Sequence, residues 1–162
     1  MAKQFGLTQP VSDGIGYQHN LRAKNPAAGA SYSVVLDSRY VWRVKHAVFT
    51  LTTDGNAANR YVTVQYLAAD TNPLWVNGAS VTVSANSTQR FVGSTDRGVA
   101  EWNTNTDVFF PLDKALLYDG GTFKVNVGNI QVGDTLTLMY FIFDRFETDP
   151  HRFSSDESNP DA

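Results

Sequence analysis

Short alternations of apolar and polar side chains fill most of this chain and constrain its fold more than any other feature. Between residues 31 and 146, hydrophobic side chains recur at every second position in short runs, and Gly, Asn, Asp and Pro separate the runs. This period is typical of half-buried strands. We count about eight or nine such strands and no convincing helix. The sequence therefore predicts an all-β, two-sheet antiparallel sandwich of jelly-roll or Greek-key type.

A hairpin is the clearest local prediction. Residues 41–52 are rich in β-forming residues, and their alternation breaks near His46, which predicts either a bulge or a strand that passes from one sheet environment to another. The turn residues at 53–59 then lead into a returning strand at residues 60–68. We expect Arg60, at the head of this strand, to bind Asp54 or a turn carbonyl in a structural role.

Two other segments carry structural expectations. Residues 139–143 are apolar on both faces, which predicts a central strand that is covered on two sides. Residues 112–117 can form one helical turn, too short to be stable alone.

The ends of the chain lack this strand pattern. We predict an extended N-terminal arm at residues 1–30, a β-sandwich domain at residues 31–147 and a flexible acidic tail at residues 148–162. The arm is dotted with apolar side chains that can lie against a neighbouring protein. The candidate interface residues are Phe5, Leu7, Val11, Ile15, Tyr17 and Leu21.

Charge and hydropathy argue against two classes of partner. Residues 144–162 hold 6 acidic and 2 basic side chains, whereas the rest of the chain holds 10 acidic and 11 basic ones. A near-neutral body without a basic cluster disfavours nucleic-acid binding. The sequence has neither a secretory signal nor an apolar run that is long enough to cross a membrane, so we expect synthesis in a cytoplasm.

The sequence offers no convincing catalytic constellation. It has no cysteine, and its three histidines are scattered, so we expect no metal site, no cofactor and no enzymatic activity. A pair of close carboxylates in a cleft would revive an enzyme hypothesis. Exposed aromatic residues can instead form a platform for a ligand such as a sugar. The candidates for that alternative are Trp75, Trp102 and Tyr118.

Residues 41–70 and 109–143 together resemble small virion structural proteins of tailed bacteriophages, the head decoration or minor head proteins. The resemblance lies in turns and strand starts and covers about 100 residues. Its motifs are Thr52-Thr53-Asp54, Ala58-Asn59-Arg60, Pro111-Leu112, Gly120-Gly121 and Gly133-Asp134.

The resemblance implies a jelly-roll-like protein that decorates or cements a capsid and is located in the virion. It also implies that the partners are the major capsid protein or other virion proteins, and that the chain forms a homo-oligomer, with a trimer favoured. The alternative is a receptor- or carbohydrate-binding module at a tail or vertex. An arm that is exchanged between subunits would favour the first reading, and a cluster of exposed aromatic residues would favour the second.

Overall fold

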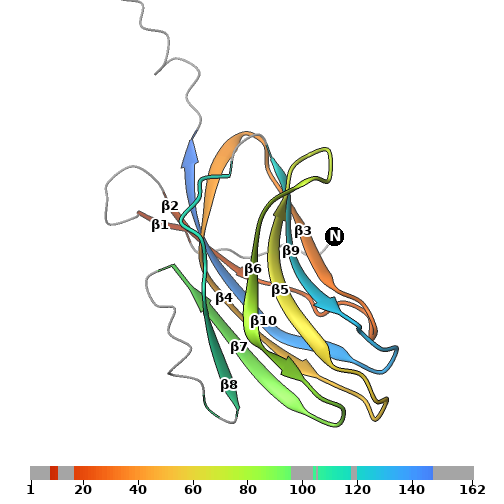
Figure 1. Cartoon of the computed structure of the whole chain (residues 1–162). Coiled ribbons are helices and arrows are strands. Elements are labelled where there is room, and N and C mark those ends of the chain that lie inside the picture. The colour runs from red at the N-terminus through yellow and green to blue at the C-terminus, as the bar shows by residue number, and fades with distance from the viewer. Residues whose placement is uncertain (1–7, 11–16, 96–103, 105, 118–119, 148–162) are drawn as a thin grey trace, which may run out of the picture.

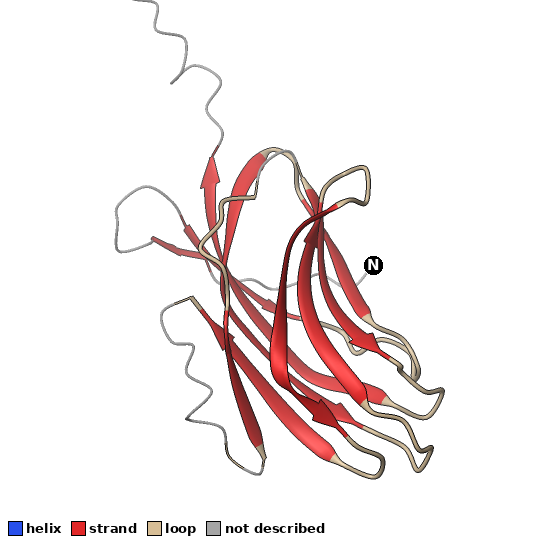
Figure 2. Cartoon of the chain, viewed as in Figure 1, coloured by secondary structure: helices blue, strands red, loops and turns tan. Residues whose placement is uncertain are grey.

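The computed structural model describes residues 8–10, 17–95, 104, 106–117 and 120–147, and these residues form ten strands and no helix (Figures 1 and 2). The strands are β1 (Thr8–Pro10), β2 (Tyr17–Arg22), β3 (Tyr32–Leu36), β4 (Tyr40–Thr52), β5 (Arg60–Leu67), β6 (Pro73–Val83), β7 (Thr88–Ser94), β8 (Asp107–Pro111), β9 (Gly121–Gly128) and β10 (Thr135–Glu147). The larger sheet has the order β1-β2-β10-β4-β7-β8, and the smaller has the order β3-β9-β5-β6. The predicted all-β sandwich is confirmed, with slightly more strands than expected.

The strand order identifies the sandwich as a jelly roll. Four antiparallel pairs define the connectivity: β2 with β10, β3 with β9, β4 with β7, and β5 with β6. From each pair to the next, the first strand lies later in the chain and the second strand lies earlier. The pairs are therefore nested, as in one long hairpin that is folded over on itself. This nested pairing is the jelly-roll arrangement of two Greek keys. Strands β1 and β8 extend the larger sheet at its two edges, and β8 pairs with β7 in parallel.

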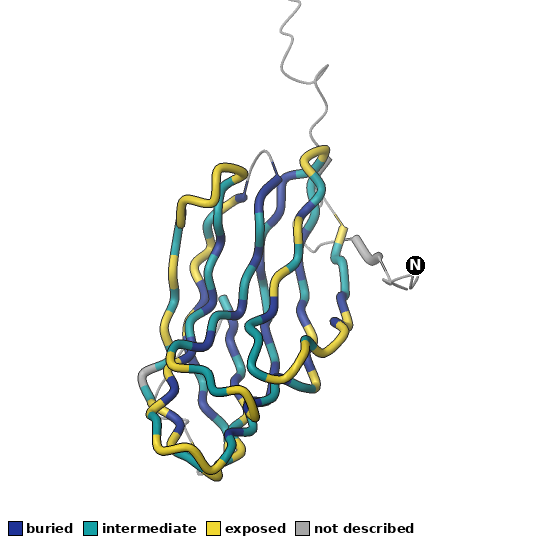
Figure 3. The backbone as a smooth tube through the Cα atoms, turned by 90° about the vertical axis from the view of Figure 1, so that its right-hand side faces the viewer, coloured by how far each residue is buried: buried dark blue, intermediate teal, exposed yellow. Residues whose placement is uncertain are grey.

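The core lies between the two sheets and is rich in aromatic residues. Along β5 the side chains alternate between buried and more exposed, so Val62, Val64 and Tyr66 face inward. The same alternation runs along the other strands, and buried and exposed segments succeed one another along the chain in Figure 3. Phe141 and Phe123 meet edge to face with ring centroids 5.1 Å apart. Such contacts add to the stabilisation that burial of apolar area provides.

The predicted hairpin is wrong, because β4 lies in the larger sheet and β5 in the smaller one, and the two strands do not pair; the turn at residues 53–59 carries the chain from one sheet to the other. Strands β4 and β5 flank the turn, and the pairing of β4 with β10 is irregular near the expected bulge. His46 lies opposite Ile142 and Val44 opposite Phe143, so the residue between His46 and Val44 has no counterpart on β10. This extra residue restores an inward-facing position for Val44 and explains the break in the alternation.

The predicted boundary at residue 30 is wrong for part of the arm. Strand β2 pairs with β10 over six positions, and Leu21 is buried in the core opposite Phe141. Tyr17–Arg22 therefore belongs to the sandwich. Leu21, one of the apolar side chains that suggested an arm, therefore belongs to the core. The local sequence does not show this, because β10, the partner of β2, lies more than a hundred residues later.

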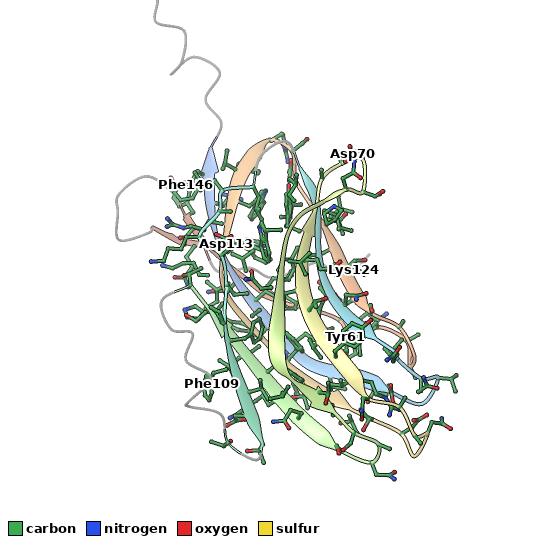
Figure 4. The ribbon with its side chains drawn as sticks, viewed as in Figure 1. Tyr61, Asp70, Phe109, Asp113, Lys124 and Phe146 are labelled. Atoms are coloured by element: carbon green, nitrogen blue, oxygen red, sulfur yellow. The ribbon has the colours of Figure 1, made fainter. Side chains whose placement is uncertain are left out.

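Two smaller expectations also need correction. Strand β10 lies between β2 and β4, as expected of a central strand, but its outer face is not fully covered: Leu138 is 71% exposed and Tyr140 is 38% exposed. Residues 112–117 form no helical turn. Instead, Leu117 makes an isolated bridge to Trp42, with its N–H donating to the Trp42 carbonyl oxygen at 2.7 Å. Figure 4 shows Phe146 near the end of β10.

Candidate interaction site

The two ends of the sandwich differ, and the lower end in Figure 1 is held together by a buried ion pair. Arg60 and Asp134 both have fully buried side chains. Arg60 donates from Nε to Asp134 Oδ2 at 2.8 Å and from Nη2 to Asp134 Oδ1 at 2.8 Å. Nη2 also donates to Asp54 Oδ1 at 2.6 Å, and Nη1 donates to the carbonyl oxygens of Asn56 and Ala58. The structural role expected for Arg60 is confirmed.

Asp134 completes this cluster, which we call the loop lock (Asp54, Arg60 and Asp134). Its two oxygens also accept the backbone N–H groups of Asp54 and Gln131, at 2.9 and 2.7 Å. Burial pushes the pKa of Asp134 upward, but the hydrogen bonds and the charge of Arg60 outweigh it and hold that pKa below its ordinary value. Because Gly29 N–H donates to the Asp134 carbonyl oxygen, the lock joins three loops that are distant in sequence.

The upper end carries a group of aromatic and charged side chains from β2, β4 and β10. The guanidinium carbon of Arg145 lies 4.3 Å from the centroid of the Tyr40 ring and 5.8 Å from that of Tyr17. Cation–π contacts of this length are attractive, most of all where water is excluded. The Nε atom of Arg145 is buried and has no hydrogen-bond partner within the described part of the chain. The orientation of the guanidinium therefore depends on its two cation–π contacts, with Tyr40 and Tyr17.

A pocket of about 160 Å³ opens between the two sheets next to this group. His19 and Leu21 of β2 form one wall, and Val34 and Leu36 of the edge strand β3 form the other. Trp42 also lines the pocket, and its Nε1 donates to the carbonyl oxygen of Asp37 at 2.9 Å. Most of the lining is apolar, as in typical small-ligand and side-chain pockets.

His19 and Asp37 are the polar groups of the pocket. The His19 ring meets Trp42 edge to face, with centroids 5.7 Å apart, and no described residue bonds its buried Nδ1. Burial, followed by the charge of Arg145, lowers the pKa of His19, so the imidazole is neutral at pH 7. Hydrogen bonds from Arg39 hold the pKa of Asp37 at about 2, so this carboxylate is ionised. The pocket thus offers an apolar wall, one neutral imidazole and, at its rim, the ion pair of Asp37 with Arg39.

The described residues include few of the predicted interface positions. Tyr17 is 43% exposed and lies beside Arg145, whereas Leu21 is only 3% exposed and serves the core, so its assignment to a protein interface is wrong. Four other arm positions lie outside the described residues: Phe5, Leu7, Val11 and Ile15.

The predicted aromatic platform can be followed at one position only. Trp75 is half-buried and packs against the core, and its indole N–H has no partner among the described residues. Trp102 and Tyr118 lie outside the described residues. No group of three metal-ligating side chains occurs in the described ranges, and no helix there is long and apolar enough to span a membrane.

Sequence reasoning missed the pocket. Alternation along β4 and β10 places Trp42 and Phe143 on inward positions, but only the strand order brings them to His19. An imidazole at an inward position of a strand was the available signal.

Comparison with known proteins gives loose structural similarities. No protein-family model matches the sequence, and no curated protein matches it. T=1 particles derived from infectious bursal virus contain a chain with a TM-score of 0.39 and 8% identity, over 90% of this chain and 31% of that chain. The Gx strain of infectious bursal disease virus gives a TM-score of 0.38 at 8% identity, over 91% of this chain and 34% of that chain. The present chain spans about a third of those proteins, and so low a similarity is no evidence that it shares their assembly.

Proposed function

We propose that this chain is a non-enzymatic structural protein of a bacteriophage particle, a capsid decoration or cement protein that binds and stabilises the capsid lattice. It is made in the host cytoplasm and assembles with the major capsid protein or other virion proteins. It acts as a homo-oligomer, with a trimer favoured. The arm residues Phe5, Leu7, Val11, Ile15 and Tyr17 are its candidate contacts with neighbours.

The loop lock is the observation that carries this proposal. Three of the motifs that resemble phage decoration proteins are short turn sequences, and each contributes one member of the lock: Asp54, Arg60 and Asp134. Sequences that look like unrelated turns are therefore parts of one buried ion-pair network. Loss of either partner of a buried ion pair is strongly destabilising, so the three turn sequences have to be kept together. This supports a resemblance that reflects the same buried ion pair at the same end of the sandwich.

The jelly roll supports the same proposal more generally. Jelly-roll sandwiches occur in viral capsid and lectin domains, among others, so the fold alone leaves several functions open. A cement protein needs a rigid body and protruding surfaces that contact neighbours. Here the lock stiffens one end of the body, and the pocket lies toward the other, next to the C-terminal part of the edge strand β3.

Mass spectrometry of purified particles of the virus that encodes the chain, with absolute copy numbers, tests the proposal. Hundreds of copies per particle are expected of a decoration protein that covers the lattice. A handful of copies would point instead to a vertex, neck or tail component and would overturn the cement role. Absence from particles that contain their other structural proteins would overturn a virion role altogether.

A further inference from the structure

The free edge of β3 is the least protected sheet edge in the described structure. Sheet edges invite pairing with another chain, and proteins commonly block them with proline, charge or bulges. The other edge strands carry Pro10 in β1, Pro111 in β8, and Pro73 in β6, whose register against β5 is also irregular twice. Strand β3 (Tyr32–Leu36) has no proline and no charged residue, and its register against β9 is regular throughout.

The pocket lies on the inward side of this edge. Val34 and Leu36 contribute to its wall, so a strand added to β3 would point alternate side chains toward it. An apolar cavity of about 150 Å³ holds one benzene molecule. The pocket, at about 160 Å³, is therefore large enough for one aromatic side chain. Strand addition in which a pocket takes an alternate side chain is an established mode of peptide recognition.

The sequence just before β1 has suitable chemistry for that occupant. β1 begins at Thr8, whose position is opposite His19, a residue of the pocket wall. Residues 1–7 precede it and contain one aromatic residue, Phe5, and a single charged side chain, Lys3. The segment is thus both apolar enough to bind the pocket and tied to the chain at the edge of the larger sheet.

Strand direction favours a donor from a second copy. β2 is antiparallel to β10 and so runs toward the loop lock, whereas β3 starts near the lock, where Gly29 N–H donates to the Asp134 carbonyl oxygen, and ends at the pocket. Because β1 is antiparallel to β2, β1 and β3 run in the same sense. A segment that leads straight into β1 of the same chain would meet β3 in parallel. A segment from another copy is free to pair antiparallel, which is the slightly more stable arrangement.

We propose that the edge of β3 and the pocket beside it receive residues 1–7 of a second copy of this chain, with Phe5 as the anchor in the pocket. Donor segment and acceptor edge are different surfaces, so the contact is heterologous and can close into a ring of subunits. The inference rests on the homo-oligomer and the arm contacts of the proposed function and names where the arm of one copy binds the next.

Cysteine cross-linking tests the contact directly, because the chain has no cysteine of its own. In an extended segment, Gln4 points to the face opposite Phe5, the same side as Val35 on β3, which is 78% exposed. Chains with Gln4→Cys and chains with Val35→Cys are co-expressed with different tags and oxidised. We expect a disulfide-linked heterodimer as the main product. Adding Phe5→Ala to the donor should reduce it at least about tenfold, since burying a Phe side chain is worth more than one tenfold step in affinity.

The matched control acceptor is Val132→Cys, at a position that is 82% exposed in the turn between β9 and β10. An equal yield with this control, or no cross-link to Val35→Cys, would overturn the proposal. The double variant Gln4→Cys/Val35→Cys, diluted into an excess of cysteine-free chain, detects pairing within one chain. A disulfide formed mainly within single chains there would overturn the assignment to a second copy.

Analytical ultracentrifugation of the full chain gives an independent measurement. The parent is expected to sediment as a discrete oligomer. Val35→Lys places a charge on the open edge and should shift it to monomer, whereas Val132→Lys should not. A Val35→Lys variant that sediments like the parent would contradict the proposal. Copy number in particles is measured separately, so a chain can be present in particles and still fail this test, or the reverse.

Discussion

Replacing Asp134 by Asn tests whether the loop lock stabilises the fold. The substitution keeps the shape of the side chain, but one carboxylate oxygen becomes an NH₂ group. Oδ1 accepts from Arg60 Nη2 and Asp54 N–H, and Oδ2 accepts from Arg60 Nε and Gln131 N–H. Whichever oxygen is replaced, two buried donors lose their acceptor, at about 1 to 3 kcal/mol each.

Breaking a buried ion pair from one side typically costs about 3 to 5 kcal/mol, in agreement with that sum. A domain of this size loses about 2 to 4 °C in Tm per kcal/mol, so we expect the variant to melt roughly 6 to 20 °C below the parent. Differential scanning calorimetry and urea unfolding measure this. The matched control is Asp107→Asn, which breaks the more exposed pair with Arg90 and should have a much smaller effect.

The pH dependence supplies a second check on the same substitution. Because the pKa of Asp134 in the folded chain lies below its ordinary value, its stabilising effect is present above about pH 4. It is lost as the pH falls through the folded-state pKa. The difference in urea midpoint between parent and Asp134→Asn should therefore be full at pH 7 and shrink in acid. A variant that melts within about 2 °C of the parent at pH 7 would refute the reasoning, since 1 kcal/mol corresponds to at least that shift.

Three further substitutions test the core and its backbone. Phe141→Asp should abolish cooperative melting, because Phe141 is fully buried and a charge there has no partner; a soluble variant that melts like the parent would contradict the placement of β10. Gly121→Ala should lower Tm strongly, since φ is +128° and a Cβ would lie 2.5 Å from the Leu67 carbonyl oxygen, whereas Gly55→Ala, whose nearest contact is 3.4 Å away, should be far milder; equal losses would disprove the steric argument. Burial raises the pKa of Tyr32 to about 12, so alkaline unfolding should set in between pH 10 and 12, and Tyr32→Phe should weaken that dependence in urea titrations at pH 9 and 11.

Local features of the sequence predicted the structure well, and features set by distant partners did not. The turn after β4 and the role of Arg60 depend on residues within one turn of each other, so turn chemistry was sufficient for them. The expected pairing of β4 with β5 was wrong, because each of these strands pairs with distant strands of its own sheet. Strand β2 has a short and weak pattern of its own. It becomes a strand because β10 pairs with it along its whole length, and a prediction from local sequence has no access to that partner.

The candidate site follows the same rule. His19, Trp42 and Phe143 come from three strands, and their inward positions are local properties of each strand. Their meeting at one pocket depends on register, which alternation alone does not determine. The same holds for Leu138 and Tyr140. Their side chains suggested a strand face that is covered, but whether a face is covered depends on elements distant in sequence, and here it is partly open to solvent.

Register also connects the two ends of the sandwich. A slip of one residue between β10 and β4 would turn every side chain of β10 to the opposite face. The lock fixes Asp134, immediately before β10, against Arg60 at the start of β5, so it determines where β10 begins relative to the smaller sheet. Arg145 lies eleven positions further along β10, roughly 35 Å away at 3.3 Å per residue. The orientation of Arg145 beside the pocket therefore depends on a contact at the far end of the same strand, and substitutions in the lock can alter the pocket without touching it.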